Sequence, residues 1–151
     1  MFTIRVYGLC IRTIGGERML LVMDEIIKGR RITKFPGGGL EYGEGTRQCL
    51  VREIREELNV DATGLRHYYT TDQFQQSAFH TTPMQVISIY YTFDLAEDQE
   101  LRSLTEPFGY TDPDQKEGCR WIPIATSEIT TLSLPIDQYV FAALKEGRDH
   151  L

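Results

Sequence analysis

The sequence predicts one domain of the α/β (α+β) class. A chain of 151 residues is long enough to bury a core of its own. Several short segments rich in β-branched and aromatic residues predict strands, and two longer segments carry apolar residues at helical spacing. No repeat, low-complexity tract or linker divides the chain, so we expect a single domain over residues 1–151.

The N-terminal part of the chain predicts strands and turns. Residues 2–12 form a β-branched and aromatic run that leads into Gly15-Gly16, a pair typical of a hairpin turn, and residues 18–24 continue as the second strand. We expect the following segment, which contains Lys28, Arg30 and Arg31, to be a basic loop. The sequence Phe-Pro-Gly-Gly-Gly over 35–39 should then interrupt regular structure.

The rest of the chain predicts two helices and further strands. A helix over 46–58 would bury an apolar stripe made of Leu50, Val51, Ile54 and Leu58. Pro135 should open or precede a last helix that runs to about Lys145 and buries Val140, Phe141 and Leu144. Strands are expected near 64–74, 86–95 and 120–124. Loops over 73–85 and 97–118 look long and irregular, and loops of this kind commonly select the substrate.

The first predicted helix carries three acids on one face. With 3.6 residues per turn, Glu56 lies about 60° to one side of Glu53, and Glu57 lies about 40° to the other side. All three are near the C-terminal end, where the helix dipole disfavours anions and like charges repel. This arrangement predicts a cation that the carboxylates hold.

The segment from Gly38 to Val60 reads GGLEYGEGTRQCLVREIREELNV. It resembles the signature of the Nudix (MutT-like) hydrolases, G-x5-E-x7-R-E-U-x-E-E-x-G-U, in which U is aliphatic. Every specified position matches except Asn59, where the family has glycine. This position follows the last helical residue, and asparagine tolerates the left-handed conformation that we expect there.

The resemblance implies a fold, a metal and roles for several residues. The fold would be an α/β/α sandwich with a mixed β-sheet between helices. Mg²⁺, or Mn²⁺ as the alternative, would bind to Glu53, Glu56 and Glu57 with a backbone carbonyl of the glycine run at Gly38, and Glu57 would be the principal ligand. Either Glu53 or Glu56 is alternatively the residue that orients the attacking water. Glu44 and Arg52 would form a structural ion pair.

Divalent cations explain why such a site would be acidic. A diphosphate is anionic and would be repelled by bare carboxylates, whereas Mg²⁺ joins carboxylate oxygens to phosphate oxygens and activates water. Many family members use a further acid from a distant loop, and Glu117 is the candidate here, with Glu41, Glu100 and Glu106 as weaker ones.

Simpler explanations exist for several of these residues. Glu56 is placed to pair with Arg52 four residues earlier, and Glu117 is alternatively an exposed loop glutamate. His67 and His80 could titrate near neutrality, although a lone histidine is usually structural. Candidates to stack on a base or sugar are Tyr68, Tyr69, Phe74, Phe79, Phe108 and Tyr110, and candidates to reach phosphates are Arg66, Arg102 and Lys116, but no substrate-binding residue can be assigned from the sequence.

Composition limits the possible partners. A net charge of −6 argues against general nucleic-acid binding, which needs a basic face. Three cysteines at irregular spacing indicate neither a disulfide framework nor a zinc site, and no segment has membrane-spanning length. We therefore expect a cytoplasmic protein with a small nucleotide-type substrate and no nucleic-acid or membrane partner, and a homodimer is left open.

The predicted function is a Mg²⁺-dependent pyrophosphohydrolase acting on a nucleoside diphosphate linked to another moiety. The short chain favours a nucleoside triphosphate, and ADP-ribose or a nucleotide sugar is the alternative, because the sequence has none of the downstream signatures that separate the family's branches. A catalytically idle, nucleotide-sensing module is an alternative of another class, although such modules usually lose an acid of the signature. Isomerase chemistry on a prenyl diphosphate would need an arrangement of acids and cysteines that we cannot place in this chain.

Overall fold

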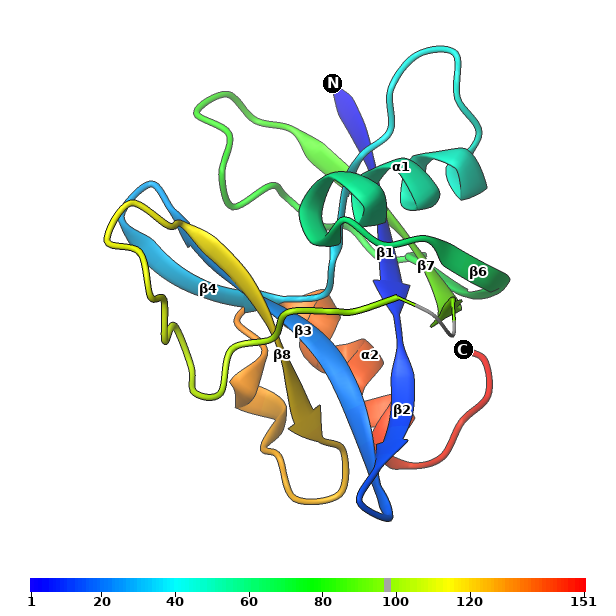
Figure 1. The fold of residues 1–151 in the computed structure, drawn as a ribbon. Coiled ribbons are helices and arrows are strands. Elements are labelled where there is room, and N and C mark those ends of the chain that lie inside the picture. The colour runs from blue at the N-terminus through cyan, green and yellow to red at the C-terminus, as the bar shows by residue number, and fades with distance from the viewer. Residues whose placement is uncertain (97–98) are drawn as a thin grey trace.

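The computed structural model describes residues 1–96 and 99–151, and it contains two β-sheets and two α-helices (Figure 1). The first sheet has the order β5(Gly37–Gly39)-β1(Phe2–Leu9)-β7(Gln85–Leu95)-β6(Ala62–Thr70). Strands β1 and β7 are parallel, and the other two pairings are antiparallel. This sheet is therefore mixed.

The second sheet is antiparallel and is built around the long strand β3(Glu17–Ile27). One edge of β3 pairs with β8(Glu117–Pro123). The other edge pairs first with β2(Ile11–Ile14) and then with β4(Arg30–Lys34). The β2–β3 connection is the predicted two-residue hairpin turn, in which Gly15 and Gly16 have φ of 59° and 82°.

The strands lie between helices α1(Thr46–Leu58) and α2(Pro135–Lys145), because neighbouring side chains of strands such as β1 and β3 enter two different cores. Val6 and Leu21 pack in the core that contains Leu50 and Ile54 of α1. Their chain neighbours pack in the core of α2, which contains Tyr7, Leu9, Leu20, Val22, Val140, Phe141 and Leu144. A short 3-10 helix, η1(Ile129–Thr131), precedes α2. The predicted α+β class and both predicted helices are confirmed.

Several local predictions were wrong. The first predicted strand breaks at Cys10 into β1 and β2, which belong to different sheets. The expected basic loop is a tight turn followed by strand β4, which contains Arg30 and Arg31. The glycine run forms β5 and pairs with β1, so it continues the sheet. These pairings join segments separated in the sequence, and local composition does not predict them.

Two further differences concern exposure and loop boundaries. Val51 was expected in the apolar stripe of α1, but it is 38% exposed. Strand β8 begins at Glu117 and not near residue 120, so this candidate acid starts a strand. Of the expected loop over 97–118, residues 97 and 98 lie outside the described part of the chain, and residues 99–116 form no named helix or strand.

Asn59 ends α1 as predicted. Its φ of 55° and ψ of 36° are left-handed, and its N–H donates to the carbonyl of Arg55 at 3.0 Å. We expect Asn59→Gly to leave stability unchanged or slightly higher, and Asn59→Val to cost about 1–2 kcal/mol because a β-branched residue resists positive φ. Chemical denaturation of the two variants measures this difference. Equal stability of the valine and glycine variants would mean that the helix ends in another way.

Candidate functional site

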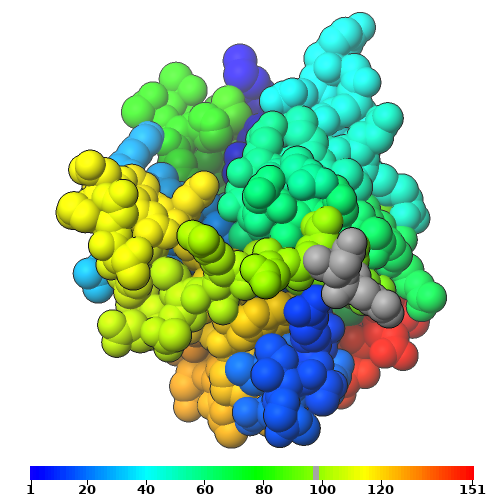
Figure 2. Space-filling view, in the orientation of Figure 1, coloured from blue at the N-terminus to red at the C-terminus, as the bar shows by residue number. Residues whose placement is uncertain are grey.

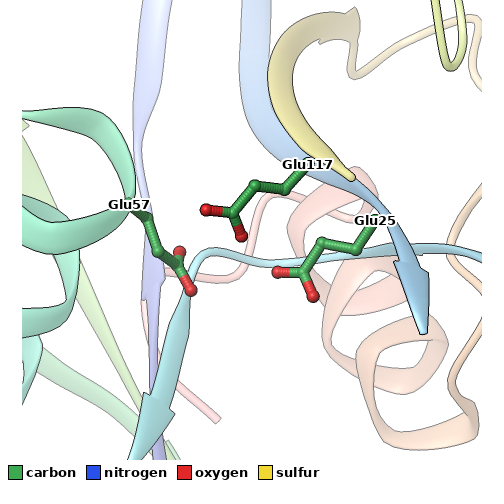
Figure 3. Close-up of side chains that lie close together, drawn as sticks. All are labelled: Glu25, Glu57 and Glu117. Atoms are coloured by element: carbon green, nitrogen blue, oxygen red, sulfur yellow. The ribbon is translucent and has the colours of Figure 1, made fainter. Parts of the chain in front are cut away.

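Three carboxylates from separate elements meet between the two sheets (Figure 3). Glu57 is in the last turn of α1, Glu25 is on β3, and Glu117 is the first residue of β8. One oxygen of each side chain lies within 4.8 Å of the others. We call Glu25, Glu57 and Glu117 the acid triad.

The register of the second sheet brings two of the three triad members together. In the β3–β8 pairing, Glu25 is directly opposite Glu117. Like charges in directly opposed cross-strand positions destabilise a sheet. Helix α1 adds a third carboxylate, which increases the repulsion. The cluster therefore has the electrostatic form of a cation site.

Burial and nearby charges raise the pKa of two members of the triad, Glu57 and Glu117. Burial is the main cause for Glu57, the Lys34 ammonium opposes it, and the charges of Glu25 and Glu117 add to it, so the pKa of Glu57 rises to about 8. Burial and Glu25 also raise the pKa of Glu117. At neutral pH without a metal, Glu57 is therefore largely protonated.

Lys34 is the local counter-charge. Its Nζ lies 3.2 Å from an oxygen of Glu25, and the residue is only 4% exposed. Burial alone would lower its pKa, but attraction to Glu57 and Glu25 outweighs burial, so the lysine pKa is raised. One ammonium cannot neutralise three carboxylates.

The donor set of the triad fits a divalent cation. Mg²⁺ and Mn²⁺ prefer hard oxygen ligands such as carboxylates, and ligands from three elements can surround one ion. Glu57 also accepts a hydrogen bond from the backbone N–H of Gly37 at 3.3 Å, which links the helix end to the glycine run.

Arg52 joins the loop before α1 to the helix. Its Nη2 lies 2.7 Å from Oε1 of Glu44, its Nε donates to Oε2 of Glu44 at 2.9 Å, and Nη2 also donates to the carbonyl of Gly39 at 3.0 Å. The Arg52 hydrogen bonds, together with one from the backbone N–H of Glu41, lower the pKa of Glu44 to about 2. Such a bidentate pair has the geometry expected of a structural ion pair.

The remaining acids of the signature lie beside the triad. Glu53 faces Gly38: a Cβ on that glycine would lie 2.4 Å from the Glu53 carboxyl group, so glycine leaves room for it. Glu53 contacts Nη1 of Arg52 at 3.0 Å. Glu56 is more exposed and pairs with the same nitrogen at 3.3 Å, so the simpler explanation of this residue is also present in the structure.

The weaker candidate acids and the histidines lie outside the triad. Glu41 is largely exposed and lies 3.7 Å from Arg52, and Glu106 packs against Gly109. His67 hydrogen-bonds to Thr70, and His80 hydrogen-bonds to Ser77. Each histidine contact is local in the chain.

Glu25 was missed by the sequence prediction. The available signal was the pair Asp24-Glu25 within the apolar segment of β3, because charged residues in buried strands are unusual. The two acids differ in role. Asp24 is fully buried and is held by Arg120 at 2.6 Å and by Thr33 at 2.8 Å, so it is structural, whereas Glu25 enters the triad.

A cleft of about 590 Å³ opens beside the triad. It is lined by residues 73–80, Val86 and residues 134–136, and by Arg5, Tyr7, Glu25, Ile27 and Lys34. A smaller hollow of about 290 Å³ on the other side is lined by Glu57, Glu117, Glu100 and Arg102 among others. Figure 2 shows that the surface is hollowed between α1 and the segment coloured yellow, near the start of β8.

The structure separates the aromatic candidates. Phe74 and Phe79 line the cleft. Tyr68 and Tyr69 are buried in the core of α2. Phe108 and Tyr110 contact Asp24: the Tyr110 hydroxyl donates to its backbone carbonyl, and the Phe108 backbone N–H donates to its carboxylate. Only Phe74 and Phe79 among these six residues are therefore placed to contact a ligand in the cleft.

Two further expectations can be compared with the structure. Cys10, Cys49 and Cys119 are free and buried, as expected for a chain without a disulfide framework. Among the described residues, no helix has both the length and the apolar character required to cross a membrane.

Comparisons with known proteins agree with this architecture. The family model described as "NUDIX domain" matches residues 1–143. A CTP pyrophosphohydrolase of Escherichia coli K12 is 37% identical over 70 residues, which are 45% of this chain and 51% of that protein. The match thus spans about half the length of this curated relative.

Solved structures share the fold at low sequence identity. A NUDIX hydrolase from Nitrosomonas europaea has a TM-score of 0.70 at 16% identity, covering 99% of this chain and 93% of that one. The NUDIX domain of Shewanella oneidensis NrtR, solved with ADP ribose, has a TM-score of 0.69 at 14% identity, covering 97% and 88%. A MutT structure from work on Aliivibrio salmonicida and Vibrio cholerae has a TM-score of 0.61 at 17% identity, covering 98% and 100%.

Proposed function

Because this chain belongs to the Nudix family, we propose that it is a divalent-cation-dependent pyrophosphohydrolase that cleaves the diphosphate bond of a nucleoside diphosphate linked to another moiety. One observation carries the proposal: Glu25 of the acid triad lines a cleft of about 590 Å³, which is large enough for a nucleotide. The apolar walls would take the nucleoside, and the acidic end would take the diphosphate.

The acid triad would hold the metal, with Mg²⁺ as the expected ion and Mn²⁺ as the alternative. When bound, the ion would neutralise phosphate charge and lower the pKa of a water molecule. Glu25, Glu57 and Glu117 would be its ligands, and the glycine run at Gly38 would allow a close backbone approach.

The remaining acids of the signature would position groups around the reaction. Glu53 or Glu56 would orient the attacking water or add a ligand, as the family signature implies, and Glu53 is the less exposed of the two. Glu44 and Arg52 would keep the loop attached to α1. The hydrolysis forms one bond from water oxygen to phosphorus, breaks one bridging P–O bond, and releases two phosphorylated products.

The favoured substrate is a nucleoside triphosphate. The similarity to the Escherichia coli CTP pyrophosphohydrolase supports this choice, and the NrtR domain solved with ADP ribose supports ADP-ribose or a nucleotide sugar as the alternative. Retention of all four signature glutamates argues against a catalytically idle sensor. The net charge of −6 supports a small-molecule substrate and no nucleic-acid partner. A cytoplasmic location and a single domain over 1–151 are part of the proposal, and the oligomeric state is left open.

A substrate panel tests this function. We expect purified protein with Mg²⁺ to release a nucleoside monophosphate and pyrophosphate from at least one nucleoside triphosphate, and to lose this activity in EDTA. Chromatography of CTP, the other triphosphates, ADP-ribose and nucleotide sugars would identify the products. Glu128→Gln, an exposed acid before η1, is the control that should keep full activity. Tight nucleotide binding without any product would instead support the sensing module.

A further inference from the structure

Two cationic side chains, Arg5 and Lys34, line the cleft and lie near Tyr7. Arg5 is on β1 in the first sheet, and Lys34 is on β4 in the second sheet. The guanidinium carbon of Arg5 lies 5.8 Å from the ring centroid of Tyr7, and Nζ of Lys34 lies 5.7 Å from the same centroid. The fold therefore brings two positive charges from separate sheets over one aromatic ring.

The two cations differ in their partners within the protein. Nε of Arg5 donates to the Tyr7 hydroxyl at 2.8 Å, and within residues 1–96 and 99–151 no carboxylate lies at ion-pair distance from the guanidinium. In the same part of the chain, Lys34 pairs only with Glu25, which belongs to the acid triad. Protein cations removed from solvent are normally paired, so Arg5, which has no carboxylate at ion-pair distance among the described residues, has capacity for an additional anion beside Lys34.

The position of the pair indicates which anion it would take. Besides Arg5 and Lys34, the cleft is lined by apolar side chains such as Phe74, Phe79 and Ile136, and by polar residues of the segment 73–80. Glu25 lines the same cleft and also belongs to the acid triad. If a nucleotide placed its nucleoside against the apolar side chains and its diphosphate at the triad, the phosphate nearest the nucleoside would lie between these two regions.

We propose that Arg5 and Lys34 together bind the phosphate group nearest the nucleoside, and that they thereby place the neighbouring phosphorus atom at the acid triad. This inference rests on the proposed function and names residues outside the signature. The planar fork of arginine and the compact charge of lysine are both common phosphate contacts. A purely structural role as the counter-charge of Glu25 is available to Lys34 but not to Arg5, which has no carboxylate partner in the described structure.

Binding of a reaction product without metal separates this role from catalysis. We would titrate CMP and AMP, and separately cytidine and adenosine, into EDTA-treated protein by calorimetry. Arg5→Met and Lys34→Met should each weaken monophosphate binding at least tenfold and leave nucleoside binding unchanged. Arg5→Lys, which keeps the charge, should recover part of the loss. Arg18→Met removes one positive charge from an exposed position near the start of β3 and should change affinity less than twofold.

A second pair of variants, both carrying Glu25→Gln, tests the role of Lys34 even if Lys34→Met alone does not fold. In Glu25→Gln protein, loss of Lys34 no longer leaves an unpaired Glu25, so Glu25→Gln/Lys34→Met should fold and still bind CMP at least tenfold more weakly than Glu25→Gln alone. Circular dichroism would verify folding. The inference is wrong if Glu25→Gln/Lys34→Met binds CMP and AMP as tightly as Glu25→Gln does, and Arg5→Met binds them as tightly as the wild type.

Failure of this inference is distinguishable from failure of the proposed function. If the wild-type protein hydrolyses a nucleotide while Arg5→Met and Lys34→Met retain its KM, the phosphate assignment is wrong and the function stands. With the correct assignment, KM for that substrate should rise at least tenfold in each variant. If the wild-type protein hydrolyses nothing in the panel, the function itself is wrong.

Discussion

Glu57→Gln should lower turnover of the best substrate by about three orders of magnitude, the range that follows loss of one preorganised group that stabilises charge at a reacting centre. Glu57 is the member of the acid triad that both the family signature and the geometry select. Glutamine keeps the size of the side chain and removes its charge. Steady-state kinetics at saturating Mg²⁺ would measure the loss.

The same substitution should leave the fold intact. Without metal, Glu57 is a largely buried carboxyl group whose pKa is raised to about 8 by burial and by neighbouring acids, so a neutral amide avoids a repulsive charge. We expect an unchanged or slightly higher melting temperature in EDTA. Glu17→Gln, an exposed acid beside the hairpin turn, is the matched control and should be fully active. A near wild-type rate for Glu57→Gln would remove this residue from the proposed ligands.

The second large effect is stabilisation by Mg²⁺, and it should grow with pH. Glu57 has a folded-state pKa of about 8, above its ordinary value of 4.5. Its protonated form therefore contributes stability fully below about pH 4.5, and this contribution is lost as pH rises through 8. The EDTA-treated protein should accordingly lose stability from this group between these values. Mg²⁺ competes with the proton, so it should stabilise the protein more at pH 8 than at pH 5.

Calorimetric melting with and without Mg²⁺ checks this effect. A ligand at about 100 times its dissociation constant adds about 2.7 kcal/mol when it binds only the native state. Glu57→Gln and Glu25→Gln should each reduce the shift and flatten its pH dependence, whereas Glu17→Gln should behave like the wild type. Melting curves insensitive to Mg²⁺ at both pH values, together with activity in EDTA, would contradict the metal assignment.

The amino-acid sequence by itself determined the local parts of the site. The spacing of apolar residues in α1 gave its bounds, Thr46–Leu58, and placed Glu57 in the last turn. Asn59 was predicted in the left-handed conformation, and the structure shows it there. The Glu44–Arg52 pair was implied by the resemblance to the family signature, and the structure contains it. The helix predictions succeeded because helix periodicity and helix-end geometry depend on residues only a few positions apart.

Only the tertiary structure decided which acids meet and what lies beside them. The β3–β8 register places Glu25 opposite Glu117. Arg5 of β1 and Lys34 of β4 come from different sheets, and both lie near the ring of Tyr7. Strands β4 and β5 escaped prediction for the same reason. Strand partners and registers are selected by the burial of whole sheet faces, a property of the assembled core that no local segment of the sequence contains.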